Sequence, residues 1–95
     1  MKYYKNLSID ESNCTVKKEG QPIHLTAMEY QLFLALLDHS GHICSRNLLL
    51  LSAWHIKAPI QTRTVDVHIA KLRKKLDLGQ NELKTVTRQG YALSG

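Results

Sequence analysis

The side chains with the most potential for chemistry are gathered in one short stretch of the sequence, residues 63–76. On a helical wheel at about 100° per residue, this stretch divides into two sides. The apolar side consists of Val65, Ile69, Leu72 and Leu76. The opposite side carries hydroxyl, methyl and cationic groups and consists of Thr64, Val67, Lys71, Lys74 and Lys75, with His68 at its border. The pattern predicts a helix that buries one side and presents the other to a partner.

This mixture of groups suits the major groove of duplex DNA. Lysine and histidine bind phosphates, lysine can also donate to guanine, and a small apolar side chain can contact the methyl group of thymine. Val67 is the predicted methyl contact because it points away from the core, although packing against a neighbouring loop is the alternative. Thr64 can donate to a phosphate at the helix N-terminus, and its other role, a helix cap, is compatible with this contact. His68 either contacts a phosphate or is an ordinary surface residue.

The distribution of charge also points to a polyanion. Residues 57–95 carry eight Lys and Arg against three Asp and Glu, whereas residues 1–56 carry five of each, so the second part holds the whole net charge of +5. Such an asymmetry favours an acidic partner, with a merely solvated basic surface as the alternative. Asp66 lies on a different side of the wheel from the lysines, so we expect it to pair with a basic residue within the fold.

No set of residues typical of an enzyme is visible. The sequence shows no Ser–His–Asp arrangement, paired carboxylates or phosphate-binding loop, so we expect no catalysis, no cofactor and no small-molecule substrate. His39, His42 and Cys44 are close in sequence, but no CxxC or HxxxH motif accompanies them. Because zinc needs three or four ligands in a closed geometry, no metal site is predicted.

The sequence also predicts where the chain resides. Cys14 and Cys44 make no disulfide framework, which favours a reducing compartment. The longest apolar run, residues 32–37, is too short to span a membrane, and the N-terminus has no apolar segment typical of a secretory signal. We therefore expect a cytoplasmic protein without membrane association.

Ninety-five residues are enough for one domain, which we expect to occupy residues 1–95. Alternating apolar residues predict three or four short antiparallel strands within the first 25 residues. Thr26 and Glu29 form a capping box that begins a buried helix, and Gly41 ends it. Ser45 caps a second helix that reaches about Trp54.

The remaining elements complete a known arrangement. The third helix covers about residues 62–76, and strands at 84–87 and 91–93 form a closing hairpin. The expected fold class is therefore α+β, a winged helix-turn-helix with an N-terminal antiparallel β-sheet, three helices and a C-terminal β-hairpin wing.

The run RTVDVHI at residues 63–69, with LRKKL at 72–76, resembles the recognition helix of the OmpR/PhoB-type response-regulator effector domain. Leu25-Thr26, Glu29-Tyr30 and Gly90-Tyr91 also match, and Trp54 falls nine positions before Arg63 as in that family. The family consists of transcription factors with a phosphorylated N-terminal receiver and a C-terminal winged helix that binds promoter DNA. This chain resembles only the second part, so we expect an isolated effector domain without a receiver.

The resemblance implies a DNA-binding role for particular residues. Trp54, Arg63 and His68 would contact phosphates, whereas Thr64, Val67 and Lys71 would face the major groove. The wing, residues 84–93, would lie at the minor groove or the backbone. The remaining predicted DNA-binding residues are Lys75, Thr85, Arg88 and Tyr91. Arg88 stands one position later than the arginine of many members, and its alternative role is that of a solvated turn residue.

The resemblance also implies partners. They are double-stranded promoter DNA with direct repeats, RNA polymerase through the loop at residues 55–61, and a second copy when the chain is joined to a receiver. A winged helix used for protein docking or RNA binding is the alternative function. A docking surface would be richer in aromatic and large aliphatic side chains, so the Thr, Val, His and Lys side chains favour duplex DNA.

Overall fold

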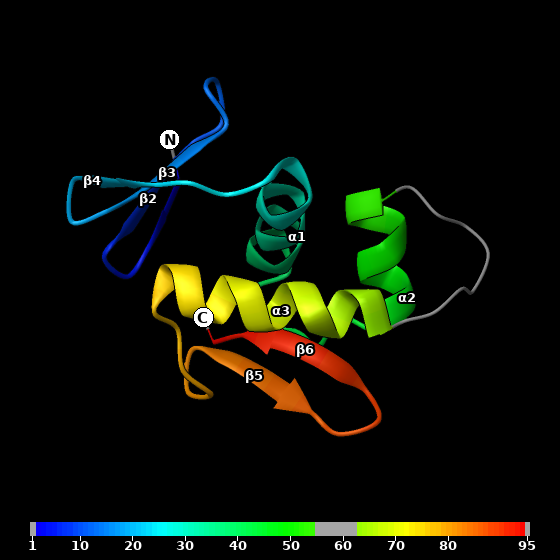
Figure 1. Cartoon of the computed structure of the whole chain (residues 1–95). Coiled ribbons are helices and arrows are strands. Elements are labelled where there is room, and N and C mark those ends of the chain that lie inside the picture. Colours follow the sequence, from blue (N-terminus) through cyan, green and yellow to red (C-terminus); the bar gives the residue numbers. More distant parts are fainter. Residues whose placement is uncertain (1, 55–62, 95) are drawn as a thin grey trace.

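A computed structural model describes residues 2–54 and 63–94 of the chain (Figure 1). An N-terminal sheet contains strands β1 (Lys2–Tyr4), β2 (Leu7–Asp10), β3 (Thr15–Lys18) and β4 (Gln21–Ile23). The helical part contains α1 (Ala27–Asp38), α2 (Arg46–Leu49), a π-helical turn η1 (Leu50–Trp54) and α3 (Arg63–Leu76). The hairpin contains β5 (Leu83–Val86) and β6 (Gly90–Leu93). The predicted winged-helix architecture is confirmed.

The N-terminal sheet is antiparallel, with its strands in the order of the sequence. Its inward side chains follow the two-residue period of a half-buried sheet, because Leu7, Ile9 and Val16 are buried whereas their neighbours are not. Ile9 pairs with Val16 across the two central strands, and this register directs the apolar side chains of both strands to the core.

Helix α1 begins with the predicted capping box. The Thr26 hydroxyl accepts a hydrogen bond from the Glu29 backbone N–H at 3.2 Å, and the Glu29 carboxylate accepts one from the Thr26 N–H at 2.9 Å. The helix ends at Asp38, slightly before the predicted stop. Gly41 follows with a φ of +86°, and its N–H donates to the Leu93 carbonyl, so the chain turns toward the hairpin at this residue.

The second predicted helix begins at the expected place but changes type. The Ser45 hydroxyl accepts from the Leu48 N–H at 3.0 Å, as an N-cap does. After one α-helical turn the chain continues as the π-helical turn η1, which buries Leu50 and Ala53. A run of four leucines, Leu48–Leu51, contains no period that would have distinguished an α-helix from a π-helix.

Helix α3 lies across α1 and beside the hairpin (Figure 1). All four residues predicted for its apolar side are buried, with exposed fractions of at most 1%: Val65, Ile69, Leu72 and Leu76. They join one core with Leu32, Phe33 and Leu36 of α1 and Leu83 and Leu93 of the hairpin. The predicted amphipathic helix is confirmed.

Strand β6 also pairs with the segment that precedes α2. The Cys44 N–H donates to the Tyr91 carbonyl at 2.7 Å, and the Tyr91 N–H donates to the Cys44 carbonyl at 3.0 Å. This close approach requires glycine at position 90, where φ is +142° and an added Cβ would lie 2.0 Å from the Cys44 carbonyl oxygen.

The substitution Gly90→Ala is expected to lower the free energy of unfolding by about 3 kcal/mol, because the methyl group would force the two backbone segments apart. Gly20→Ala is the matched control, since Gly20 has a similar need for positive φ but no described atom within 4 Å of an added Cβ. It should cost about 1 kcal/mol. Urea unfolding monitored by circular dichroism measures both, and equal losses would contradict the role given to the Cys44 contact.

Candidate nucleic-acid interface

Helix α3 presents an open surface to solvent opposite its buried side. We call this surface the α3 face and define it by four residues, Thr64, Val67, Lys71 and Lys74, all of which are exposed. The Val67 side chain is 47% exposed, although it is apolar. Neither the sheet nor the hairpin covers these residues, so the side predicted to meet a partner is accessible.

The two lysines of the α3 face differ from four other cations of the described residues. Lys2, Lys18, Arg46 and Lys75 each form an ion pair with a carboxylate. Within residues 2–54 and 63–94, no carboxylate lies within ion-pair distance of Lys71 or Lys74. Their ammonium groups therefore remain available to an anion from outside the molecule.

His68 and Arg63 flank the α3 face. The His68 ring is partly buried, and its Nδ1 lies 2.8 Å from the Thr64 carbonyl oxygen of the same helix. This contact fixes the ring along the helix surface. Arg63 is exposed at the first turn of α3. It adds positive charge beside Asp66 and contributes to the lowering of the pKa of that carboxylate.

Asp66 points away from the α3 face and connects three elements. Its Oδ1 accepts a hydrogen bond from Arg46 Nε at 2.8 Å and another from the Tyr91 hydroxyl. Burial alone would raise the pKa of Asp66, but the Tyr91 and Arg46 hydrogen bonds outweigh burial and hold the pKa below its ordinary value. The expected pairing of Asp66 with a basic residue of the fold is confirmed.

Tyr91, a predicted DNA-binding residue, lies in the interior. The residue is only 4% exposed, and two guanidinium groups lie near its ring, with Arg46 at 5.2 Å and Arg73 at 5.8 Å from the ring centroid. The sequence did not reveal that Arg46 and Arg73 hold this ring, because both contacts join residues that are far apart along the chain.

Arg73 attaches the hairpin to α3. Its Nη2 donates to the Leu83 carbonyl at 2.6 Å and to the Thr85 hydroxyl at 2.7 Å. The Thr85 side chain, which the sequence predicts to face DNA, is exposed and also serves as an acceptor for α3. The hairpin is therefore fixed to the helix at β5.

Arg88 occupies the turn of the hairpin. It is exposed and has a φ of +66°, and the next residue, Gln89, donates its N–H to the Val86 carbonyl. No carboxylate among the described residues forms an ion pair with Arg88. The turn thus presents a further cationic group at the end of the hairpin.

The Trp54 side chain and the loop at residues 55–61 lie outside the part of the chain that the structure describes. Trp54 closes the turn η1, but the surroundings of its side chain lie outside the description. The predicted polymerase loop, residues 55–61, and Thr62 lie outside the described residues.

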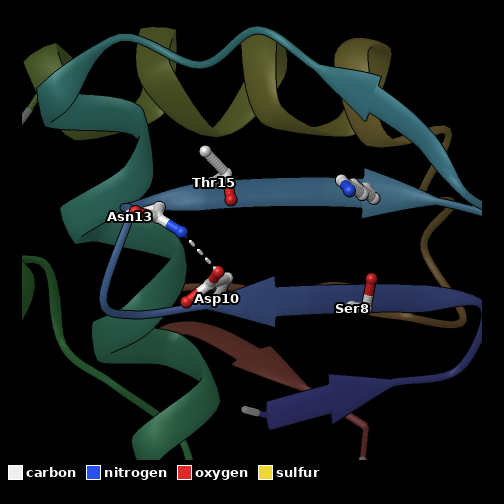
Figure 2. A pocket seen from close by; sticks show the side chains of 5 residues that line it. Ser8, Asp10, Asn13 and Thr15 are labelled. Atoms are coloured by element: carbon white, nitrogen blue, oxygen red, sulfur yellow. Dashed lines mark hydrogen bonds between the residues drawn. The ribbon is translucent and has the colours of Figure 1, made fainter.

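A shallow pocket of about 300 Å³ lies on the outer side of the N-terminal sheet (Figure 2). Its lining consists of Ser8, Asp10, Asn13, Thr15 and Lys17. The Asn13 amide donates to Asp10 at 2.8 Å, and this hydrogen bond lowers the pKa of the Asp10 carboxylate. The carboxylate therefore stabilises the turn between β2 and β3, and the pocket shares no residue with the α3 face.

The described part of the chain offers no group of three His, Cys, Asp or Glu residues arranged to hold a metal ion. In the same part of the chain, no helix has the length and apolar character needed to cross a membrane.

Residues 20–93 match the family described as "Transcriptional regulatory protein, C terminal". The chain belongs to this family. Among curated relatives, the transcriptional regulatory protein CseB of Streptomyces avermitilis is 38% identical over 90 residues, which are 95% of this chain and 37% of CseB. The chain thus spans about two fifths of the length of such relatives.

Solved structures agree with this membership. The RstA DNA-binding domain of Klebsiella pneumoniae, in complex with the RstA box, matches with a TM-score of 0.88 and 30% identity over 98% of this chain and 95% of that chain. DrrB, a Thermotoga maritima OmpR/PhoB homolog, matches with a TM-score of 0.84 and 31% identity over 99% of this chain and 44% of that chain. The predicted resemblance to OmpR/PhoB-type effector domains is confirmed.

One lysine of α3 is paired with a buried carboxylate of this effector domain. Lys75 Nζ lies 2.6 Å from Glu29 Oε1, and the Glu29 side chain is 2% exposed. Burial would raise the pKa of Glu29, but the Lys75 ammonium and the Thr26 N–H outweigh it, so the pKa lies below its ordinary value. The ion pair therefore joins the last turn of α3 to the first turn of α1.

The pair makes stability depend on pH. A carboxylate whose pKa is lowered by folding stabilises the protein above its unfolded pKa of about 4.3, and this contribution is lost as the pH falls through the folded pKa. Glu29→Gln should lower the free energy of unfolding by about 2 kcal/mol at pH 7, less than for a fully buried pair because Lys75 is partly exposed. The difference from the wild type should shrink toward pH 3.

Urea unfolding at pH 7, 5, 4 and 3 measures this effect. Glu19→Gln is the control, because Glu19 is an exposed carboxylate without an ion pair to the described residues. A Glu29→Gln effect that stays constant over the whole pH range would contradict the pairing.

Proposed function

We propose that this chain binds duplex DNA in a sequence-specific manner and controls transcription as the effector domain of a two-component response regulator. The observation that carries the proposal is the α3 face. It combines two lysines that form no ion pair with the described residues, an exposed hydroxyl and an exposed methyl-bearing side chain. Family membership and the likeness to the RstA domain, whose structure contains its DNA box, support the same conclusion.

In the proposed complex α3 lies in the major groove. Thr64, Val67 and Lys71 contact base edges, with Val67 against a thymine methyl group and Lys71 donating to guanine. Arg63, His68 and Trp54 contact phosphates and set the register of the domain on the duplex. The exposure of Arg63, Thr64, Val67 and Lys71 supports these assignments.

The hairpin lies at the adjacent minor groove or backbone, where Arg88 provides the positive charge. The exposed side chain of Thr85 lies on the same hairpin, and its hydroxyl already accepts a hydrogen bond from Arg73. Lys75 and Tyr91 support the interface through contacts within the fold, because their polar groups are bound to Glu29 and Asp66 respectively.

The wider partners follow from the family. We infer that the domain recognises direct repeats, acts in the bacterial cytoplasm, contacts RNA polymerase through residues 55–61 and forms a homodimer when joined to a receiver. Membership of a family of transcriptional regulators supports this assignment.

Replacing Lys71 tests base recognition. Lys71→Ala should weaken binding to a duplex selected by the wild-type domain about tenfold or more and should weaken binding to random duplexes much less, because each base contact contributes about 1–3 kcal/mol of discrimination. Fluorescence anisotropy with both duplexes gives the ratio. Equal weakening for both would assign Lys71 to a phosphate instead.

Replacing Arg63 tests phosphate contact. Contacts with about five phosphates predict a slope of roughly −4 to −5 for the logarithm of affinity against the logarithm of salt concentration. Arg63→Ala should weaken binding to all duplexes alike and reduce the magnitude of the slope by about one. Lys17→Ala, which removes the same charge from the outer side of the sheet, should leave the slope unchanged. A slope near zero for the wild type would count against DNA binding altogether.

A further inference from the structure

Arg46, Asp66 and Tyr91 form a side-chain cluster, which we call the Asp66 cluster. It joins the first residue of α2, the first half of α3 and strand β6. Asp66 lies directly before Val67 in sequence and two residues after Thr64, so its contacts act on the same turn of α3 that carries the proposed base contacts.

The partners of Asp66 are themselves firmly held. Tyr91 exchanges two backbone hydrogen bonds with Cys44, and Arg46 lies only two residues beyond Cys44. The Arg46 guanidinium also covers one side of the Tyr91 ring. Asp66 therefore binds to a rigid surface formed by β6 and the start of α2, rather than to two independent side chains.

The other end of α3 is fixed by different contacts. Lys75 pairs with Glu29 of α1, Asp77 pairs with Lys18 of β3, and Arg73 binds β5. These contacts hold the last turns of the helix. The rotation of the first turns depends on the apolar contacts of Val65 and Ile69 together with the Asp66 cluster.

A small rotation of the first turns of α3 about the helix axis would displace the side chains proposed to contact bases. An α-helix with its side chains is about 10–12 Å in diameter, so a rotation of about 10° moves groups at its surface by about 1 Å. A recognition site must be held to about 0.5 Å. Apolar contacts are not directional, whereas the two hydrogen bonds to one carboxylate oxygen define a specific rotation.

We propose that Asp66 is a positioning residue for base recognition. By binding Arg46 and Tyr91, it fixes the rotation of the first half of α3 and so determines where Thr64 and Val67 point. The inference rests on the proposed DNA-binding function, but it assigns sequence discrimination in part to a group that does not touch the DNA.

The test compares the affinity of the domain for two duplexes. One duplex is selected by the wild-type domain from a random pool, and the other is a scrambled duplex of equal length. Tyr91→Phe removes the hydroxyl and retains the ring and the net charge. We expect it to lower the ratio of specific to scrambled affinity about five- to tenfold, while the salt dependence of binding to the scrambled duplex remains that of the wild type.

Glu29→Gln is the matched control because it breaks a polar contact of the other end of α3. It should lower the melting temperature. Because it removes one negative charge and releases Lys75, it should raise the affinity for both duplexes alike and leave the affinity ratio within about twofold of the wild type. Asp66→Asn is the second variant, should Tyr91→Phe not fold. It removes a negative charge beside Arg63, so we expect higher affinity for the scrambled duplex together with a lower affinity ratio.

The outcomes separate the two claims. A wild-type affinity ratio in folded Tyr91→Phe, or in Asp66→Asn if only that variant folds, would overturn the positioning role while the proposed function stands. An equal loss of the ratio in Glu29→Gln would also overturn it, since general loosening of the fold would then be the cause. A wild-type domain that selects no sequence would overturn the proposed function and this inference together.

Discussion

The structure depends on the one-sided burial of α3. Val65, Ile69, Leu72 and Leu76 are removed from water by α1 and the hairpin, whereas the α3 face receives no cover. Burial of these four side chains contributes roughly 1.5–3 kcal/mol each and determines which side of the helix faces outward. The four residues of the α3 face are therefore placed by contacts on the opposite side of the helix.

Polar contacts then refine what apolar burial leaves undefined. The two ends of α3 use different pairs, with Asp66 bound to Arg46 and Tyr91 at one end and Lys75 bound to Glu29 at the other. Both carboxylates have a lowered pKa, because the cationic and hydroxyl partners outweigh the cost of burial. Asp66 and Glu29 thus bind groups of the fold, whereas Lys71 and Lys74, which form no ion pair with the described residues, remain exposed.

Periodic and local features of the structure were predictable from the sequence. The apolar side of α3 follows a period of 3.6 residues, and the capping box of Thr26 and Glu29 involves residues only three apart. The roles of Lys75 and Tyr91 were not predictable, because they depend on partners 46 and 25 residues away. On a wheel Lys75 resembles Lys71 and Lys74, and only the position of α1 distinguishes a lysine that closes the fold from lysines that face outward.

The edges of the N-terminal sheet have a consequence for how copies of the chain can associate. Each edge strand, β1 and β4, contains only three residues, and β4 carries Pro22, which has no N–H to offer a further strand. Short edges with a missing donor are poor templates for strand addition. Two copies brought close together would therefore resist joining through these two edges into a continuous intermolecular sheet, however high their local concentration.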